Sequence, residues 1–77
     1  MKQVSIYTTP TCQYCKMAKE FFKSNEVEYK ENDVSVEEEK RNEMVEKSGQ
    51  MGVPVIDIEG EIIVGFDEPR LKELLGL

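Results

Sequence analysis

The two cysteines of the chain, Cys12 and Cys15, are separated by two residues. A strand-like stretch at residues 4–7 precedes the pair and a helix-like stretch at residues 17–22 follows it, which places one sulfur at the first turn of a helix. Unpaired backbone N–H groups and the helix dipole favour negative charge there, and the thiolate is the nucleophile of disulfide exchange. Because Cys15 is spaced to close a short disulfide with Cys12, the pair is predicted to perform thiol–disulfide chemistry.

Three other roles are open to a Cys-x-x-Cys pair. A zinc site takes four ligands, and the chain has no histidine and no third cysteine, so a complete site would need a second subunit or carboxylates. A purely structural disulfide would close too small a loop to remove much unfolded-state entropy. Inert buried thiols are the third alternative. The redox pair is the preferred interpretation, and no metal site is predicted.

Length and composition indicate a single small domain, residues 1–77, with 39% hydrophobic and 34% charged residues. No apolar run approaches the roughly 20 residues of a membrane span, and residues 1–6 enter a strand without a signal-peptide pattern. Two cysteines at catalytic spacing suit a reducing compartment, so we expect a cytoplasmic monomer. The net charge of −6 opposes phosphate, so neither nucleic acid nor an anionic membrane is expected as a partner.

Hydrophobic periodicity predicts an α/β domain in the order strand, helix, strand, helix, strand, strand, helix. The predicted strands are residues 4–9, 27–30, 52–58 and 61–64. The predicted helices begin near Cys12, at Val36 and after Asp67, and Thr11, Ser35 and Asp67 are their expected N-caps. Two βαβ-like crossovers followed by a hairpin imply a four-stranded mixed sheet with three flanking helices.

Two residues stand out within these elements. Tyr14 either begins the apolar face of the first helix, with Met17, Ala18, Phe21 and Phe22, or lies beside the sulfurs; both interpretations stay open. Pro54 cannot donate a hydrogen bond to a strand ladder. It is therefore expected at a sheet edge, at a bulge or after a cis peptide bond.

Over essentially its whole length the chain resembles the thioredoxin-fold family and, within it, the glutaredoxins. The resemblance rests on residues 6–8 leading into the motif of residues 12–15, on Gly52-Val53-Pro54, and on residues 64–68. It implies a thioredoxin-like fold, βαβαββα, and a dithiol thiol–disulfide oxidoreductase that reduces protein or glutathione mixed disulfides. Such a protein serves electron transport and cell redox homeostasis, with glutathione as the expected reductant and no bound cofactor.

The resemblance also implies the roles of individual residues. Cys12 matches the attacking cysteine, which forms a mixed disulfide with the substrate, and Cys15 matches the resolving cysteine. The positions that match substrate-binding residues are Tyr14, Val53, Pro54, Gly65, Phe66 and Asp67. Among them, Pro54 matches a cis-proline that faces the sulfurs, and residues 65–67 match the turn that holds the γ-glutamyl end of glutathione.

The chain also departs from typical glutaredoxins. Gln13 replaces a proline, Thr9 replaces a basic residue that meets the glycyl carboxylate of glutathione, and Val64 replaces a glycine. Phe66 is similar to the Gly-Phe of glutaredoxin-like redoxins that serve ribonucleotide reductase and draw electrons from thioredoxin reductase. The alternatives are therefore a redoxin of that type or a non-enzymatic metal-bridged dimer that shares Cys12 between subunits.

Replacing Thr9 with lysine is expected to improve reduction of the protein by glutathione. A restored charge-assisted contact is worth about 1.5–3 kcal/mol, which corresponds to about tenfold or more in affinity. Steady-state disulfide reduction with glutathione and glutathione reductase measures the gain. Strong glutathione dependence in the wild type that Thr9→Lys leaves unchanged would tell against this account.

Overall fold

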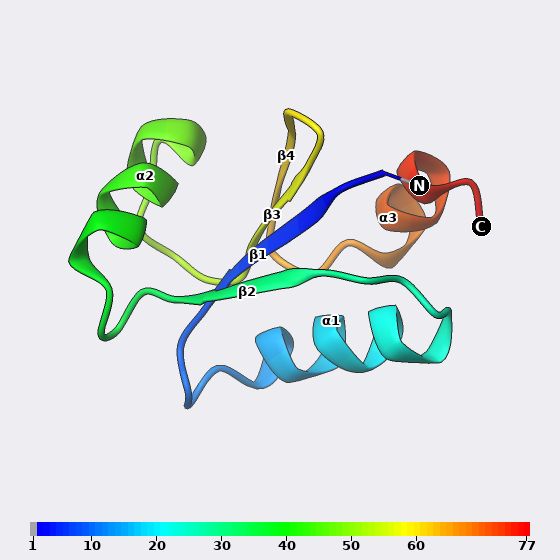
Figure 1. The fold of residues 1–77 in the computed structure, drawn as a ribbon, viewed down its shortest axis with the longest axis horizontal. Helices are drawn as coiled ribbons and strands as arrows, with labels where there is room; N and C mark the ends of the chain where they lie inside the picture. Colours follow the sequence, from blue (N-terminus) through cyan, green and yellow to red (C-terminus); the bar gives the residue numbers. More distant parts are fainter. Residues whose placement is uncertain (1) are drawn as a thin grey trace.

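The computed structural model describes residues 2–77, so Met1 of the predicted domain lies outside the described residues. The elements in chain order are β1 (Val4–Thr8), α1 (Gln13–Ser24), β2 (Lys30–Asp33), α2 (Glu38–Ser48), β3 (Val55–Ile58), β4 (Glu61–Val64) and α3 (Glu68–Leu75) (Figure 1). The predicted α/β class and the order βαβαββα are confirmed.

The four strands form one mixed sheet in the order β2-β1-β3-β4. β1 runs parallel to β2 and antiparallel to β3, and β3 runs antiparallel to β4. The interpretation of the second connection as βαβ-like is therefore wrong, because α2 joins two strands of opposite direction. Hydrophobic pattern marks where strands lie but not which way they run, so strand pairing decides the direction.

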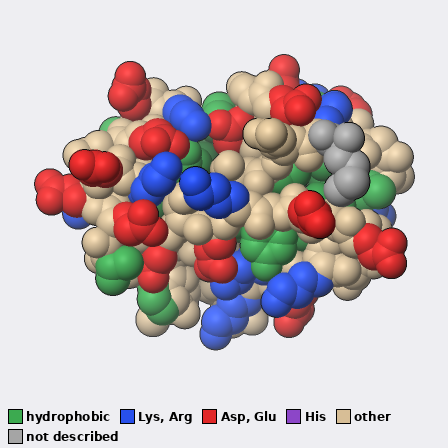
Figure 2. All heavy atoms as spheres, in the orientation of Figure 1, with side chains coloured by type: hydrophobic (Ala, Val, Ile, Leu, Met, Phe, Trp, Pro, Cys, Tyr) green, Lys and Arg blue, Asp and Glu red, His purple; other side chains and the backbone are tan. Residues whose placement is uncertain are grey.

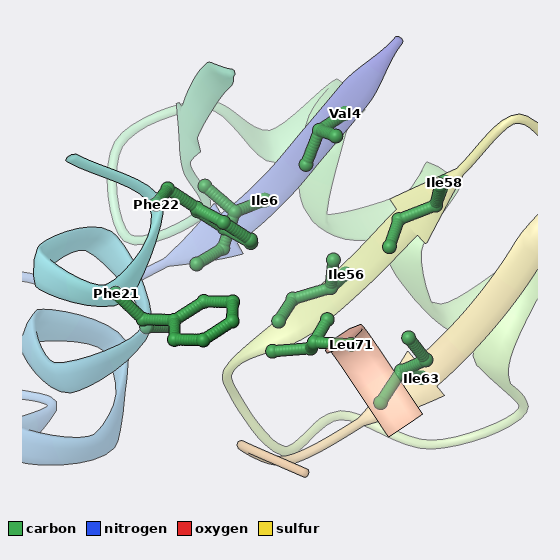
Figure 3. Packing of buried hydrophobic residues seen from close by; sticks show 9 residues of the cluster. Val4, Ile6, Phe21, Phe22, Ile56, Ile58, Ile63 and Leu71 are labelled. Carbon is green, nitrogen blue, oxygen red and sulfur yellow. The ribbon is translucent and has the colours of Figure 1, made fainter. Parts of the chain in front are cut away.

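The first apolar face of the sheet is covered by α1 and α3. Figure 3 shows Phe21 and Phe22 of α1 pointing toward Ile6, Ile56 and Leu71. The buried cluster on this face comprises Val4, Ile6, Ala18, Phe21, Phe22, Ile56, Ile58, Ile63 and Leu71. Burial of each large side chain contributes about 1.5–3 kcal/mol, so this cluster is the main support for α1.

The opposite face is covered by α2, which lies on the other side of the sheet from α1 (Figure 1). Its cluster consists of Tyr7, Val34, Met44 and Val55. Met44 is the one residue of α2 that is buried. This helix, in which most residues are charged, is therefore attached through Met44, through the partly buried Val45 and through polar contacts.

The second strand lies further along the chain than predicted. It covers Lys30–Asp33 rather than residues 27–30, and Asn32, expected in a turn, is 3% exposed within the strand. Val27 and Tyr29 instead pack against the first apolar cluster before the strand begins. Val27 and Tyr29 alternate with polar residues because both pack on this cluster, and this alternation led to the wrong position for the strand.

The second helix also begins later than predicted, and Ser35 does not cap it. Both the N–H and the Oγ of Ser35 donate to Asp33 Oδ1, at 2.9 and 2.5 Å. The N-cap is Glu37, whose side chain makes no capping bond, and Val36 remains 76% exposed. Asp33 competes for the serine and builds a local turn in place of the expected capping box.

Figure 2 shows acidic and basic side chains interspersed over one face of the molecule, with small apolar areas between them. Among the helices of residues 2–77, none is long and apolar enough to cross a membrane.

A polar network ties α2 to the sheet. Lys47 Nζ donates to Asp57 Oδ2 at 2.8 Å and to the Tyr7 hydroxyl at 3.1 Å, and Tyr7 donates to Glu43. Burial alone would raise the pKa of Asp57, but hydrogen bonds from Lys47 and from the Gly60 N–H outweigh it and lower this pKa. The folded protein therefore favours the ionised carboxylate.

Replacing Asp57 with asparagine should destabilise the protein at neutral pH by about 1–2 kcal/mol, because Asn keeps an acceptor for Gly60 but loses the charged bond to Lys47. A lowered folded pKa contributes stability above the unfolded value, about 4, and loses it as the pH falls through the folded value. Urea unfolding should show a deficit that is largest near pH 7 and disappears in acid. Glu39→Gln, on the exposed face of α2, is the control; an equal deficit at every pH would contradict the prediction.

Candidate functional site

Cys12 caps the helix that carries the motif. Its backbone is extended (φ −85°, ψ 113°), and its Sγ accepts a hydrogen bond from the Cys15 N–H at 3.1 Å. The expectation that Thr11 is the N-cap is wrong by one residue, because the sulfur takes the place that a capping oxygen would occupy. The sulfur therefore lies against the positive end of the α1 dipole, where a thiolate is stabilised.

Cys15 is less exposed than Cys12, and its environment holds its proton. Both cysteines are free thiols; Cys12 is half-buried, whereas Cys15 is 1% exposed. Burial, followed by the hydrogen bond with the Cys12 sulfur, raises the pKa of Cys15 to about 12. The geometry thus provides one accessible sulfur beside backbone donors and one buried sulfur that retains its proton.

The apolar face of α1 is rotated relative to its predicted position. Cys15, Ala18 and Phe22 point inward, whereas Tyr14 is 61% and Met17 is 40% exposed. Residues three and seven positions apart share one helix face, so the buried cysteine turns Tyr14 and Met17 to one side. The interpretation of Tyr14 as the start of the apolar face is therefore wrong, and its position beside the sulfurs stays a prediction. The expectation that Met17 is a core residue is also wrong.

A second segment is brought next to the motif by the pairing of β1 with β3. Tyr7 pairs with Val55, so the residues just before β3 lie at the end of β1 from which the motif continues. The Val53–Pro54 peptide bond is cis, as predicted, and Pro54 is buried. Because β3 begins at Val55 rather than at residue 52, Pro54 precedes the ladder and need not donate to it.

A third segment follows β4. Val55 pairs with Val64, and the Gly65 N–H donates to the Pro54 carbonyl at 2.8 Å. Gly65 has a φ of +84°, a conformation that residues with a Cβ rarely adopt. The chain then turns into α3, where the Asp67 carboxylate caps the helix by accepting from the Arg70 N–H at 3.2 Å.

These segments enclose a surface hollow of about 380 Å³. Its lining residues are Tyr14, Val53, Pro54, Val64, Gly65, Phe66 and Asp67. All six residues that the sequence assigned to substrate binding thus lie together, although their binding role stays a prediction. Val64, which the sequence did not assign, adds a side chain that is 54% exposed. Its position directly before Gly65 in the sequence was the signal that could have identified Val64 as a lining residue.

Within residues 2–77 no group of three or more histidine, cysteine, aspartate or glutamate side chains is arranged to hold a metal ion.

Comparison with known proteins relates the whole chain to one group. The family model described as Glutaredoxin matches residues 4–63. An uncharacterized glutaredoxin-like 8.6 kDa protein in the rubredoxin operon of Clostridium pasteurianum is 43% identical over 72 residues, which cover 94% of this chain and 96% of that protein. Glutaredoxin 3 of Escherichia coli (strain K12) is 40% identical over 68 residues, which cover 88% of this chain and 82% of that protein.

Solved structures agree with the sequence relatives. A mutant of the thioredoxin-like protein BC3987 superimposes with a TM-score of 0.91 at 36% identity, covering 99% of this chain and 97% of that one. The glutaredoxin (grx-1) from Archaeoglobus fulgidus gives a TM-score of 0.87 at 29% identity, and the match covers 97% of this chain and 87% of that one. These similarities confirm the predicted thioredoxin-like fold.

Limited alkylation of the reduced protein should label Cys12 before Cys15. Cys15 is buried and its raised pKa keeps it protonated, so it presents little thiolate to the reagent. Substoichiometric iodoacetamide at mildly acidic pH, followed by peptide mass spectrometry, gives the order of labelling. Unfolding in urea is the control and should remove the difference. Preferential labelling of Cys15 in the folded protein would reverse the assignment.

Proposed function

The chain belongs to the glutaredoxin family, and from this premise we propose that it is a dithiol thiol–disulfide oxidoreductase. It reduces disulfide-containing proteins, or their mixed disulfides with glutathione, through Cys12 and Cys15. The observation that carries the proposal is the hydrogen bond from the Cys15 N–H to the Cys12 sulfur at the start of α1. That bond places the Cys12 sulfur at the start of the helix, and Cys15 lies within one helical turn of it.

In the first step the Cys12 thiolate attacks a sulfur of the substrate disulfide. A bond forms between Cys12 and that sulfur, and the other substrate sulfur leaves as a thiolate that takes a proton from solvent. The backbone N–H groups of the first turn of α1 stabilise the negative charge on Cys12 before the attack.

In the second step Cys15 loses its proton and attacks the Cys12 sulfur. The Cys12–Cys15 disulfide forms, the bond from Cys12 to the substrate breaks, and the second substrate sulfur leaves as a thiolate. Two electrons have then passed to the substrate, and an external dithiol or two molecules of glutathione must reduce the protein again.

The hollow beside the motif supplies the binding surface for the segment that carries the disulfide. Val53, directly before Pro54, presents its backbone to an extended substrate chain by β-type hydrogen bonds. The turn of residues 65–67, tied to Pro54 by the Gly65 N–H, receives the next part of the substrate. In glutathione this part is the γ-glutamyl group.

Glutathione is the proposed reductant, and thioredoxin reductase is the second candidate. The observation that favours the second is the apolar rim of the hollow. Val64 is 54% exposed, and Phe66 is half-buried with its ring 6.0 Å from that of Phe21. Such a rim suits an apolar protein surface better than a charged tripeptide. For either donor we propose that the protein acts as a cytoplasmic monomer.

Replacing Cys15 with serine should trap the first intermediate. The variant keeps the Cys12 nucleophile but cannot complete the second step, so a mixed disulfide with a protein substrate should accumulate and be released by dithiothreitol. Mass spectrometry of the intact adduct measures it. Cys12→Ser is the matched control and should form no adduct. Equal adducts with both variants would contradict the assigned roles.

The electron donor is decided by assaying one disulfide substrate with two reducing systems in parallel. One contains NADPH, glutathione and glutathione reductase, and the other contains NADPH and thioredoxin reductase without glutathione. Faster turnover with glutathione supports the first candidate, and turnover with thioredoxin reductase alone supports the second. Absence of turnover in both, with a folded and reduced protein, would contradict the proposed function.

A further inference from the structure

A polar cluster of Lys19, Glu31 and Thr8 lies on the side of α1 that carries Cys15. Lys19 is four residues after Cys15, which places the two on the same side of α1. The Lys19 Nζ donates to Glu31 Oε2 at 2.9 Å, and the Thr8 hydroxyl donates to the same oxygen at 2.8 Å. Thr8 is 1% exposed, so β1, β2 and α1 together fix the position of the lysine ammonium.

Both members of the ion pair are charged near neutral pH. The hydrogen bond between them is the main cause that raises the pKa of Lys19 and lowers the pKa of Glu31. The charge of Tyr29 also raises the pKa of Lys19, and the charge of Asp33 raises the pKa of Glu31. Burial and Cys12 raise the pKa of Cys15, whereas a backbone hydrogen bond from Thr9 and, by a smaller amount, the positive charge of Lys19 lower it.

The influences on the ionisation of Cys15 change when Cys12 reacts. In the reduced protein the hydrogen bond and the charge of Cys12 both hold the proton on Cys15. Once Cys12 is bonded to a substrate sulfur, its sulfur is neutral, so its charge no longer opposes ionisation of Cys15. The positive charge of Lys19 stays in place throughout, because Lys19 is held by Glu31, which accepts from Thr8, and not by Cys12.

We propose that Lys19, anchored by Glu31, is a positioning residue that stabilises the thiolate of Cys15 during resolution of the mixed disulfide. This inference rests on the proposed function. In the step concerned, the Cys15 thiol gives its proton to solvent and its sulfur bonds to Cys12. The substrate sulfur leaves Cys12 as a thiolate and takes a proton from solvent. Lys19 remains protonated and supplies charge alone.

Ellman's reagent, 5,5′-dithiobis(2-nitrobenzoate), separates the two steps in one rapid-mixing experiment. Attack by Cys12 releases one coloured thionitrobenzoate, and resolution by Cys15 releases the second. With the reagent at one equivalent of protein, the fast phase therefore reports Cys12 and the slow phase reports Cys15. The wild type and the Lys19→Met, Lys19→Arg and Lys23→Met variants are compared over a range of pH, with circular dichroism as the check of folding.

Lys19→Met should slow the second phase by about three- to tenfold at neutral pH and move its rise to higher pH, because the nearby positive charge is lost. The first phase should remain within about twofold of the control. Lys23→Met removes the same charge from the exposed part of α1 and should leave both phases near wild type. Lys19→Arg keeps the charge and should retain most of the rate of the second phase.

Two results would overturn the inference while leaving the proposed function intact. One is a second phase in Lys19→Met with the rate and pH dependence of Lys23→Met. The other is an equal loss in Lys19→Arg and Lys19→Met, which would show that charge is not the property that matters. A wild type that releases only the first thionitrobenzoate would contradict the dithiol mechanism itself and this inference with it.

Discussion

The hydrogen bond from the Cys15 N–H to the Cys12 sulfur is the constraint on which the rest of the site depends. It makes Cys12 the N-cap of α1, so the sulfur lies where the helix dipole favours negative charge. Cys15 lies one turn into the helix, where packing of α1 on the sheet buries its side chain and desolvation keeps it protonated. The hydrogen bond at Cys12 and the burial of Cys15 together make two chemically identical residues unequal.

The remaining parts of the site follow from strand register. Because β1 pairs with β3, and β3 with β4, the residues before β3 and after β4 meet at the end of β1. Pro54 and Gly65 are joined there by a backbone hydrogen bond. The clusters under α1 and α2 fix the sheet from both faces. The site is therefore a consequence of how the sheet is paired, and only Tyr14 of the hollow comes from a helix.

The order of elements, the fold class and the cis bond before Pro54 could be predicted because they follow from periodicity, from family resemblance and from the chemistry of proline. Asp67 caps α3 as predicted, but the other two N-caps could not be predicted from residue preferences, since the Cys12 sulfur displaced Thr11 and Asp33 captured Ser35. Nor could the rotation of α1 that exposes Tyr14, because it depends on which residue the sheet buries. Local competition and tertiary packing, which a pattern does not contain, decided these points.

The central claim is that Cys15 keeps its proton at pH values where an ordinary cysteine ionises, and a titration of the reduced protein tests it most directly. With 13C-labelled cysteine, the Cβ shifts of Cys12 and Cys15 are followed by NMR from about pH 5 to about pH 10.5, a range that spans ordinary cysteine ionisation. The account predicts that the Cys15 signal stays at its thiol position throughout, in line with a pKa of about 12. Ionisation of Cys15 within this range would contradict it.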